Sequence, residues 1–256
     1  MQTITQTACP ALATELQSMN RIGILVSGGC DSEVLLRAAA DVLGNANTVA
    51  FTAVTPFIAE YYTDIVQAAT EELKIKLVRV ILDPMQINHI KTNSAMRCYH
   101  CKKAIYSTIK TEALRENITI LADGTNLDDS HKHRPGMKAA EEFKILHPFK
   151  TTGMTKADVR ILGGLLKMAD PGRPADSCLA TRIPEGTPIT AELISLIARI
   201  EQPLRSQVKA RLRARVSNRC VTLEYRTTDK ELVDASRKQL QAIAESAKFS
   251  ILFLET

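Results

Sequence analysis

The segment Ser27-Gly28-Gly29-Cys30-Asp31-Ser32 has the residue types and the spacing of a phosphate-binding turn. It follows an apolar, β-branched run and precedes a helical pattern of apolar residues. A strand that turns through paired glycines into a helix directs several backbone N–H groups at one spot, and the helix dipole strengthens this anion site. Asp31 is suited to hold a magnesium ion that bridges phosphate oxygens. The alternative is an ordinary strand-to-helix turn with a serine cap, which two adjacent glycines disfavour.

The motif Ser27-Gly28-Gly29-x-Asp31-Ser32 resembles the pyrophosphatase loop (PP-loop) of enzymes that cleave ATP between its α and β phosphates. No Lys-Ser or Lys-Thr pair follows, so it is not a Walker-type loop. The resemblance implies adenylation of a carboxylate or carbonyl oxygen with release of pyrophosphate, and it leaves the acceptor open. We place the adenine against the strand end at Ala53 and Thr55. Gly124 follows another strand, at a carboxyl end where ligands of such sheets collect.

Strand and helix patterns alternate through the first two thirds of the chain. Apolar runs predict strands at 22–26, 48–54, 76–82 and 118–122, and helical spacing predicts helices near 32–43, 58–73 and 99–116. The alternation predicts an α/β domain with helices on both faces of a parallel sheet. The resemblance of the loop implies that this domain is of the PP-loop ATP pyrophosphatase type. Thr155 and Asp158 have the pattern of a capping box for a helix that runs through Met168.

A segment rich in helix breakers, Asp170 to Pro174, marks the predicted domain boundary. We therefore expect a nucleotide domain at 1–172 and a small α+β domain at 173–256. A role of the second domain in substrate binding, sulfur transfer and oligomerisation is what the family resemblance given below implies. The pattern of the second domain predicts a helix from Thr190 to Ile200, strands near 208–216 and 219–226, a helix near 229–247 and a last strand at 249–254.

The composition limits the class of protein. The 256 residues are 45% hydrophobic and 24% charged, as in a globular protein with a substantial core. No apolar stretch is long enough to span a membrane, and the first residues lack a secretory pattern, so we expect a cytoplasmic protein. The formal charge of +5 favours anionic ligands. Six cysteines in such a compartment indicate metal ligands or reactive thiols rather than disulfides.

Three cysteines have the setting of ligands. Cys98 and Cys101 form a Cys-x-x-Cys at the start of a predicted helix, where the helix N-terminus and nearby cations favour the thiolate. The pair alone is also compatible with a thioredoxin-like redox site, and zinc would need further ligands. Cys178 lies in a segment rich in breakers, and three cysteines suffice for a [4Fe–4S] cluster with one open iron. A buried thiol is the alternative for Cys178.

Further segments resemble the LarE family in the same order along the chain. They are Arg-Cys-Tyr-His-Cys-Lys at 97–102, Asp-Gly-Thr-Asn-Leu-Asp-Asp at 123–129, Arg-Pro-Gly at 134–136 and Cys-Leu-Ala-Thr-Arg-Ile-Pro at 178–184. Members of this family insert sulfur during synthesis of the nickel-pincer nucleotide, the cofactor of lactate racemase. The resemblance implies adenylation of pyridinium-3,5-biscarboxylic acid mononucleotide and replacement of a carboxylate oxygen by sulfur.

The resemblance also implies cofactors and partners. It places the chain in the group in which Cys98, Cys101 and Cys178 hold a [4Fe–4S] cluster that carries an exogenous sulfide. In the other group a single cysteine, matched by Cys178, gives up its own sulfur. ATP and Mg²⁺ complete the cofactors, and the partners are a sulfur donor, a downstream nickel-insertion protein and further copies of this chain. Glu201 and Glu224 match carboxylates near the sulfur-donating site that bind a metal, unless both are ordinary surface residues.

The chain departs from the family pattern at three places. Lys132 stands where an acidic residue is expected, Glu185 stands where Tyr is usual, and there is no Trp. These departures affect the substrate contacts more than the ATP chemistry.

A basic row follows the predicted domain boundary. Lys209, Arg211, Arg213 and Arg215 alternate with apolar residues, which places the four cations on one face of a strand. Arginine suits a bidentate grip on phosphate or carboxylate, and the family position assigns Arg211 and Arg213 to the substrate's phosphate. We also expect Arg182 to be one of the cofactor-binding residues. A solvated sheet face is the alternative, and RNA binding is disfavoured because no RNA-binding module or aromatic stacking pattern is present.

Other functions share the same loop chemistry. A tRNA thiolase would need an RNA-binding surface, and an amide-forming ligase would use the cysteines only structurally. A regulator that merely binds nucleotide would leave the three cysteines without a role.

Overall fold

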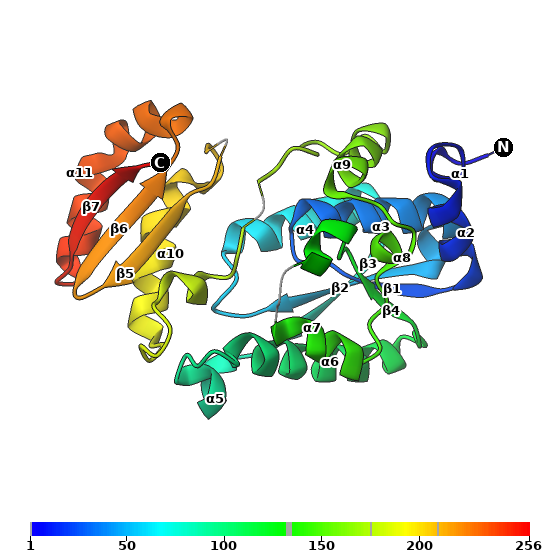
Figure 1. Ribbon diagram of the computed structural model, residues 1–256, viewed down its shortest axis with the longest axis horizontal. Coiled ribbons are helices and arrows are strands. Elements are labelled where there is room, and N and C mark those ends of the chain that lie inside the picture. Colours follow the sequence, from blue (N-terminus) through cyan, green and yellow to red (C-terminus); the bar gives the residue numbers. More distant parts are fainter. Residues whose placement is uncertain (1, 132–134, 175, 209) are drawn as a thin grey trace. The chain divides into compact units, whose positions relative to one another are not determined.

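The computed structural model describes residues 2–131, 135–174, 176–208 and 210–256 (Figure 1). The chain divides into two compact units. Unit 1 comprises Met1–Val54, Tyr62–Leu82 and Cys98–Gly172, and unit 2 comprises Thr55–Tyr61, Asp83–Arg97 and Arg173–Thr256. Two short segments that precede residue 172 in sequence therefore pack with the C-terminal residues.

Unit 1 contains a four-stranded sheet in which every neighbouring pair is parallel. The strands are β1 (Ile22–Leu25), β2 (Thr48–Val54), β3 (Lys76–Ile81) and β4 (Leu121–Asp123), in the order β3-β2-β1-β4. All four residues of β1 are buried, as expected for the centre of a parallel sheet. The predicted parallel α/β architecture is confirmed, and the polar turn after β1 emerges at the carboxyl edge beside the end of β4.

Helices cover both faces of this sheet (Figure 1). They are α1 (Ile4–Ala8), α2 (Pro10–Ser18), α3 (Cys30–Leu43), α4 (Glu60–Glu72), α6 (Arg97–Arg115), α7 (Pro135–Glu142), α8 (Pro148–Thr151) and α9 (Lys156–Leu165), with 3₁₀ turns η1 (Asn45–Asn47) and η3 (Leu127–His131). One apolar core joins Ile22 and Ile24 to α2, α3, α4 and α9. A second core joins Leu25 and Phe51 to α6 and α7.

The helix α9 begins as predicted and ends three residues early. Thr155 and Asp158 form the predicted capping box, in which each side chain accepts a hydrogen bond from the other residue's backbone. The helix stops at Leu165 because Lys167 adopts a left-handed conformation with φ of 57°. The amide of Met168 then bonds back to the carbonyl of Gly163, which is a Schellman ending.

Unit 2 contains a three-stranded sheet covered by two helices. Its elements are η2 (Pro84–Gln86), α5 (Asn88–Lys91), η4 (Leu179–Arg182), α10 (Ala191–Arg205), β5 (Arg213–Ser217), β6 (Cys220–Tyr225), η5 (Thr227–Asp229), α11 (Lys230–Ser246) and β7 (Ser250–Glu255). The pair β5–β6 is antiparallel and β6–β7 is parallel. Alternate residues of β5 and β6 are buried, and α10 and α11 contact each other and this sheet.

Two predicted boundaries in unit 2 were wrong. The strand expected at 208–216 begins only at Arg213, because its partner β6 ends at Tyr225 and leaves Arg211 without a neighbour to pair with. Lys209 lies outside the described residues. The helix expected to end at Ile200 continues to Arg205 through Pro203, since Leu204 and Arg205 are buried against the rest of unit 2.

Within the described part of the chain, no helix combines the length and the apolar character needed to cross a membrane.

Candidate functional site

The turn after β1 is closed by hydrogen bonds between its own residues. The amide of Ser27 donates to Ser32 Oγ at 3.2 Å, and Ser32 Oγ donates to the carbonyl of Gly29 at 3.0 Å. Gly29 is the N-cap of α3 and supplies no side-chain cap. Because the first amides of a helix have no intrahelical acceptor, the start of α3 offers donors to an anion.

Two glycines are required by the packing of this turn. Gly28 has a φ of +78°, and a Cβ there would lie 2.6 Å from the carbonyl oxygen of Tyr62. A Cβ on Gly124 would lie 2.6 Å from the backbone of Asp31 and Ser32. The end of β4 is thus packed directly against the turn after β1, where any larger residue would push the backbone away.

Asp31 occupies the second position of α3 and is mostly buried. Its Oδ2 accepts hydrogen bonds from Asn126 Nδ2 at 3.0 Å and from Lys156 Nζ at 3.4 Å. Its Oδ1 is buried without a hydrogen-bond partner in the described part of the chain. Burial raises the pKa of Asp31, although the charge of Lys156 opposes this shift. A buried carboxylate oxygen with no donor fits the hard, oxygen-seeking Mg²⁺ ion.

Ala53 and Thr55 lie at the end of β2, as the sequence predicts. Ala53 belongs to unit 1, whereas Thr55 belongs to unit 2 and is buried. The hydroxyl of Thr55 accepts a hydrogen bond from the amide of Phe57 at 3.2 Å.

Cys98 and Cys101 lie at the N-terminal end of α6, where they were predicted. Their spacing of three residues places them on one face of the helix, and both are partly exposed. Cys178 is also partly exposed and forms the N-cap of η4 in unit 2. Among the described residues, no three or more His, Cys, Asp or Glu side chains are already gathered as a metal site.

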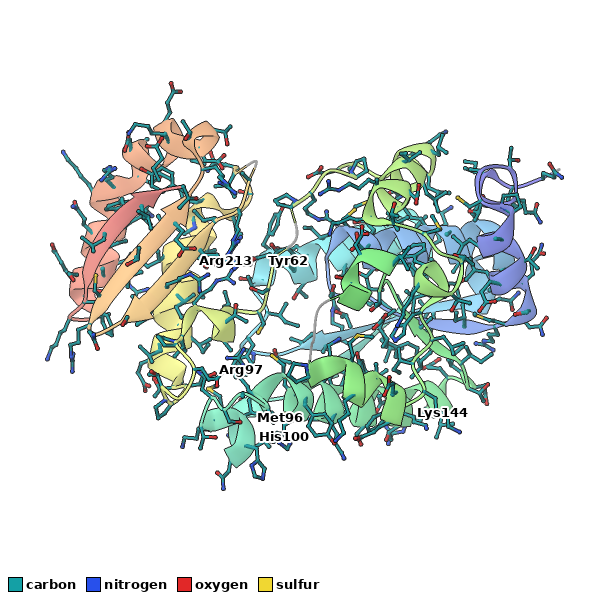
Figure 2. The ribbon with its side chains drawn as sticks, in the orientation of Figure 1. Tyr62, Met96, Arg97, His100, Lys144 and Arg213 are labelled. Carbon is teal, nitrogen blue, oxygen red and sulfur yellow. The ribbon has the colours of Figure 1, made fainter. Side chains whose placement is uncertain are left out.

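A hydrogen bond within unit 2 involves the residue that precedes Cys98. This residue, Arg97, belongs to unit 2, and Figure 2 labels its side chain. Its guanidinium donates to the carbonyl of Ala180 at 3.0 Å, two residues after Cys178. The neighbouring Asn93 donates to the carbonyl of Pro184 at 2.7 Å. The approach to α6 is therefore bonded to the turn that begins at Cys178.

A buried ionic cluster supports the Cys178 turn. Arg182 is 1% exposed and donates to Glu201, to both carboxylate oxygens of Asp176, and to Ser177 and Thr181. The charges of Arg205 and Arg182 outweigh the effect of burial and hold the pKa of Asp176 below its usual value. Because protein acceptors engage the guanidinium of Arg182, a nucleotide would have to displace some of them to bind it.

Glu201 is not a surface residue, contrary to the alternative considered from sequence. It is 1% exposed and accepts hydrogen bonds from Arg182, from Arg205 and from the amide of Ala214. A metal on Glu201 would have to compete with these donors. Glu224 is partly exposed, and its carboxylate pairs with Arg215 at 2.6 Å.

The basic row is shorter than predicted, but its two strand residues share one face. Arg213 and Arg215 both lie in β5, opposite the face that carries the buried Ala214 and Val216. Arg215 and Glu224 line a cavity of about 370 Å³, together with Thr181 to Pro184. Arg211 precedes the strand and is exposed.

Arg213 has the electrostatic character of an anion site. Its Nε is buried without a hydrogen-bond partner among the described residues, and the nearest carboxylate oxygen, of Asp176, is 3.9 Å away. Burial and the charges of Arg211, Arg182 and Arg215 lower the pKa of Arg213. A bound phosphate or carboxylate would relieve both the missing hydrogen bond and the repulsion.

Sequence reasoning missed Asp176, Lys156 and the pair of Asp123 and His147. His147 Nδ1 lies 2.7 Å from Asp123 Oδ1 at the carboxyl end of β4, and both side chains are mostly buried. Asp123 lies at a predicted strand end and in the motif at 123–129, but neither signal points to His147. No motif or spacing links Asp176 or Lys156 to its partner.

The fold and the site define a protein with a parallel α/β unit, in which a glycine turn links the inner strand β1 to the start of α3. No protein-family model matches the chain. It is 34% identical over 197 residues to an uncharacterized protein of Synechocystis sp., covering 75% of this chain and 73% of the relative. It is 32% identical over 197 residues to an uncharacterized protein of Methanocaldococcus jannaschii, covering 76% and 73%.

A relative with a named activity shows the family. The chain is 30% identical over 213 residues to the pyridinium-3,5-bisthiocarboxylic acid mononucleotide synthase of Lactiplantibacillus plantarum, covering 83% of this chain and 77% of that protein. The chain therefore belongs to the LarE family, as the motifs indicated.

Proposed function

We propose that this protein is an ATP-dependent sulfurtransferase that converts a carboxylate of pyridinium-3,5-biscarboxylic acid mononucleotide into a thiocarboxylate. The observation that carries the proposal is the family relation to a synthase named for the corresponding bisthiocarboxylic acid. The turn after β1 agrees with this proposal, because it combines a closed glycine loop with a buried carboxylate oxygen, Asp31 Oδ1, to which no group in the described part of the chain donates.

In this proposal the turn acts as a PP-loop. The amides of Gly28 and Gly29 and the hydroxyls of Ser27 and Ser32 bind the phosphates of ATP. Asp31 holds Mg²⁺, which neutralises phosphate charge. The adenine lies against the end of β2, at Ala53 and Thr55, and Gly124 keeps the end of β4 close to the loop.

The proposed reaction has two steps. A substrate carboxylate oxygen attacks the α phosphorus of ATP, the bond to the bridging oxygen of the β phosphate breaks, and pyrophosphate leaves. Sulfide then adds to the acyl carbon and AMP leaves, so a thiocarboxylate forms without any net electron transfer. The chain contributes mainly by positioning the reactants and stabilising the charge that develops on the leaving groups.

We assign the sulfur side to Cys98, Cys101 and Cys178. Three thiolates are a fitting donor set for a [4Fe–4S] cluster with one iron not bound by protein, and such an iron supplies a site for exogenous sulfide. The bond from Arg97 to the carbonyl of Ala180 supports the assignment, since it ties the start of α6 to the Cys178 turn. We also propose that Arg211 and Arg213 bind the phosphate of the substrate, for which Arg213 Nε, which has no hydrogen-bond partner among the described residues, is a suitable donor.

The decisive experiment is a turnover assay on anaerobically reconstituted protein with ATP, sulfide and the pyridinium biscarboxylate mononucleotide. The proposal predicts one pyrophosphate released and one oxygen replaced by sulfur in each modified carboxylate, as detected by mass spectrometry. Asp31→Ala should abolish pyrophosphate release while the iron content stays unchanged. Pyrophosphate release that persists in Asp31→Ala would contradict the role of Asp31.

The cluster is tested separately by iron analysis. The reconstituted protein should hold about four irons per chain. Cys98→Ala should lose them, and Cys220→Ala, which changes a cysteine on β6, serves as the matched control. Iron retained in a triple variant of Cys98, Cys101 and Cys178 would overturn the cluster. A Cys178 residue lighter by one sulfur after a single turnover would instead indicate a sacrificial donor.

The remaining expectations concern the compartment, the oligomeric state and the partner of the protein. We propose a cytoplasmic homo-oligomer that passes its product to a nickel-insertion protein. The size of the native particle and a pull-down with the nickel-insertion protein test these two points.

A further inference from the structure

A buried pair of side chains, His147 and Asp123, lies at the carboxyl end of β4. His147 Nδ1 is 2.7 Å from Asp123 Oδ1, and the side chains are 15% and 14% exposed. A carboxylate bonded to Nδ1 keeps the proton of the neutral ring on that nitrogen, so Nε2 is left as a proton acceptor. A histidine held in this way by a carboxylate has the arrangement of a general base.

The backbone fixes both members of the pair. The segment before His147 runs beside β4, where the amide of Leu146 donates to the carbonyl of Leu121 at 2.9 Å. The amide of Asp123 in turn donates to the carbonyl of Leu146 at 3.0 Å. The Asp123 carboxylate also accepts a hydrogen bond from the amide of Thr125 at 3.0 Å. The imidazole is therefore held in one orientation from both of its connections to the chain.

The pair is close to both halves of the proposed reaction, and all the residues concerned belong to unit 1. Asp123 is paired in register with Leu25, which directly precedes the turn after β1. The next residue, Gly124, packs on the backbone of that turn. The charge of Lys102, the residue after Cys101, acts on Asp123. The end of β4 thus lies beside the proposed ATP turn and within the field of the helix that carries two of the cysteines.

Two titratable groups of α6 face the pair. Burial by itself would raise the pKa of Asp123, but the hydrogen bond with His147 and the charge of Lys102 outweigh it and lower the pKa. Burial raises the pKa of the Tyr106 hydroxyl, so this group stays neutral. Asp123 therefore remains a carboxylate, which orients the imidazole and stabilises it once it has accepted a proton.

We propose that His147 is the general base of the sulfur-transfer step and that Asp123 is its positioning residue. This inference rests on the proposed function, because it takes hydrosulfide and the acyl adenylate as reactants. The hydrosulfide sulfur bonds to the acyl carbon, the bond from that carbon to the phosphate oxygen breaks, and AMP leaves. The S–H proton passes to His147 Nε2, so a thiocarboxylate anion remains. The imidazolium then gives the proton to water, and no electrons are exchanged.

The inference assigns His147 to the second step alone. Adenylation needs no base, because the attacking carboxylate is already ionised. Exchange of label between pyrophosphate and ATP, measured with the pyridinium biscarboxylate mononucleotide but without sulfide, reports this first step. Thiocarboxylate formation in a single turnover with sulfide, followed by mass spectrometry, reports both steps. A residue that merely supports the fold would affect the two measurements alike.

His147→Gln should slow thiocarboxylate formation by about a hundredfold to ten-thousandfold, the scale of general base catalysis, and leave pyrophosphate exchange within about twofold. Asp123→Asn should also slow sulfur transfer and spare exchange, because an amide no longer holds the ring in this tautomer. His89→Gln, which changes an exposed histidine on α5, is the matched control and should alter neither rate.

The pH dependence gives a readout that a structural role would not move. The ratio of the wild-type to the His147→Gln transfer rate should fall toward acid pH, because an imidazolium cannot accept a proton. Taking the ratio at each pH cancels the protonation of hydrosulfide, which both proteins share. A ratio that is constant with pH would overturn the inference.

The outcomes separate this inference from the proposed function. If the wild-type chain forms no thiocarboxylate, the proposed function and this inference fail together. If the wild type forms it and His147→Gln does so equally fast, only this inference is overturned. Equal losses of exchange and transfer would also overturn it, since they would show a structural effect on the turn. Each assay is run below the melting temperature of the variant.

The tautomer of His147 supplies a test that needs no variant. Nitrogen NMR of the isotopically labelled chain should show Nδ1 protonated and Nε2 unprotonated in the neutral ring, as the bond to Asp123 requires. A proton on Nε2 of the neutral ring would contradict its role as the proton acceptor.

Discussion

Arg182 Nε donates a 2.9 Å hydrogen bond to Glu201 Oε1, and both side chains are almost completely buried. This contact joins η4, directly after Cys178, to the C-terminal part of α10. Asp176 closes the arrangement from the other side, with its Oδ1 2.8 Å from Arg182 Nη2. The Cys178 turn is therefore held by charges rather than by apolar packing alone.

We expect Glu201→Ala to destabilise the protein by about 3–5 kcal/mol, because it leaves two buried guanidinium groups, of Arg182 and Arg205, with the single carboxylate of Asp176 between them. Equilibrium unfolding in urea measures the change. Glu224→Ala removes the partly exposed partner of Arg215 and should cost less than about 1 kcal/mol. Equal losses in the two variants would show that the buried cluster contributes no more than a surface pair. Alkylation of Cys178 should also be faster in Glu201→Ala, because the turn loses its support.

Gly124→Ala should disturb the turn after β1 by a steric effect. The new Cβ would lie 2.6 Å from the backbone of Asp31 and Ser32, which is too close for non-bonded atoms, so the turn would have to move away. We expect at least tenfold weaker ATP binding and a lower free energy of unfolding, measured by calorimetry and urea unfolding. Gly153→Ala is the control for added bulk, since nothing lies within 4 Å of that position. Its positive φ predicts lower stability without a change in ATP affinity.

The adjacent glycines of α9 should respond in opposite directions. A Cβ on Gly164 meets nothing within 4 Å, so Gly164→Ala should stabilise the protein by about 0.5–1 kcal/mol through helix propensity. A Cβ on Gly163 would meet Val34 at 2.8 Å, so Gly163→Ala should destabilise it by about 1–3 kcal/mol through overpacking. Urea unfolding of the two variants checks both signs. Stabilisation by Gly163→Ala would contradict the close packing of α9 on α3.

The pair of Asp123 and His147 predicts a dependence of stability on acid pH. Burial by itself would raise the pKa of Asp123, but the hydrogen bond from His147 and the charge of Lys102 outweigh it and lower the pKa. A lowered pKa means that the unfolded chain binds more protons in this range. The stabilisation is therefore complete above the unfolded pKa of about 3.9 and is lost as the pH falls through the lower folded value.

Two variants test this assignment. Acid pH lowers the free energy of unfolding partly by protonating the Asp123 carboxylate. In Asp123→Asn this part of the decrease should disappear. In His147→Ala the buried carboxylate loses its partner, so the loss of stability relative to wild type should be largest near neutral pH and smaller below about pH 4. Urea unfolding between acid and neutral pH measures both curves. Parallel curves for wild type and Asp123→Asn would contradict the lowered pKa.

Part of the fold followed directly from local patterns. The buried run at Ile22 to Leu25 and the alternation of strands and helices predicted the parallel sheet, because burial on both faces requires continuous apolar strands. The capping box at Thr155 was also correct, since a cap depends on residues three apart. The start of β5 was not predictable in this way, because it depends on where the partner strand β6 ends.

The sequence by itself determined which reactive and ligand-binding groups are present. These are a glycine turn with a carboxylate, a Cys-x-x-Cys at a helix start and arginines at alternate positions. These features depend on neighbours in sequence, and the conformation of a few residues is enough to create them. Only the tertiary structure decided which groups meet. It brought Lys156 to Asp31 across 125 residues, buried Glu201 against Arg182, and joined Arg97 to Ala180. Such contacts depend on how helices pack on sheets, and periodicity shows that a face is buried without showing what lies against it.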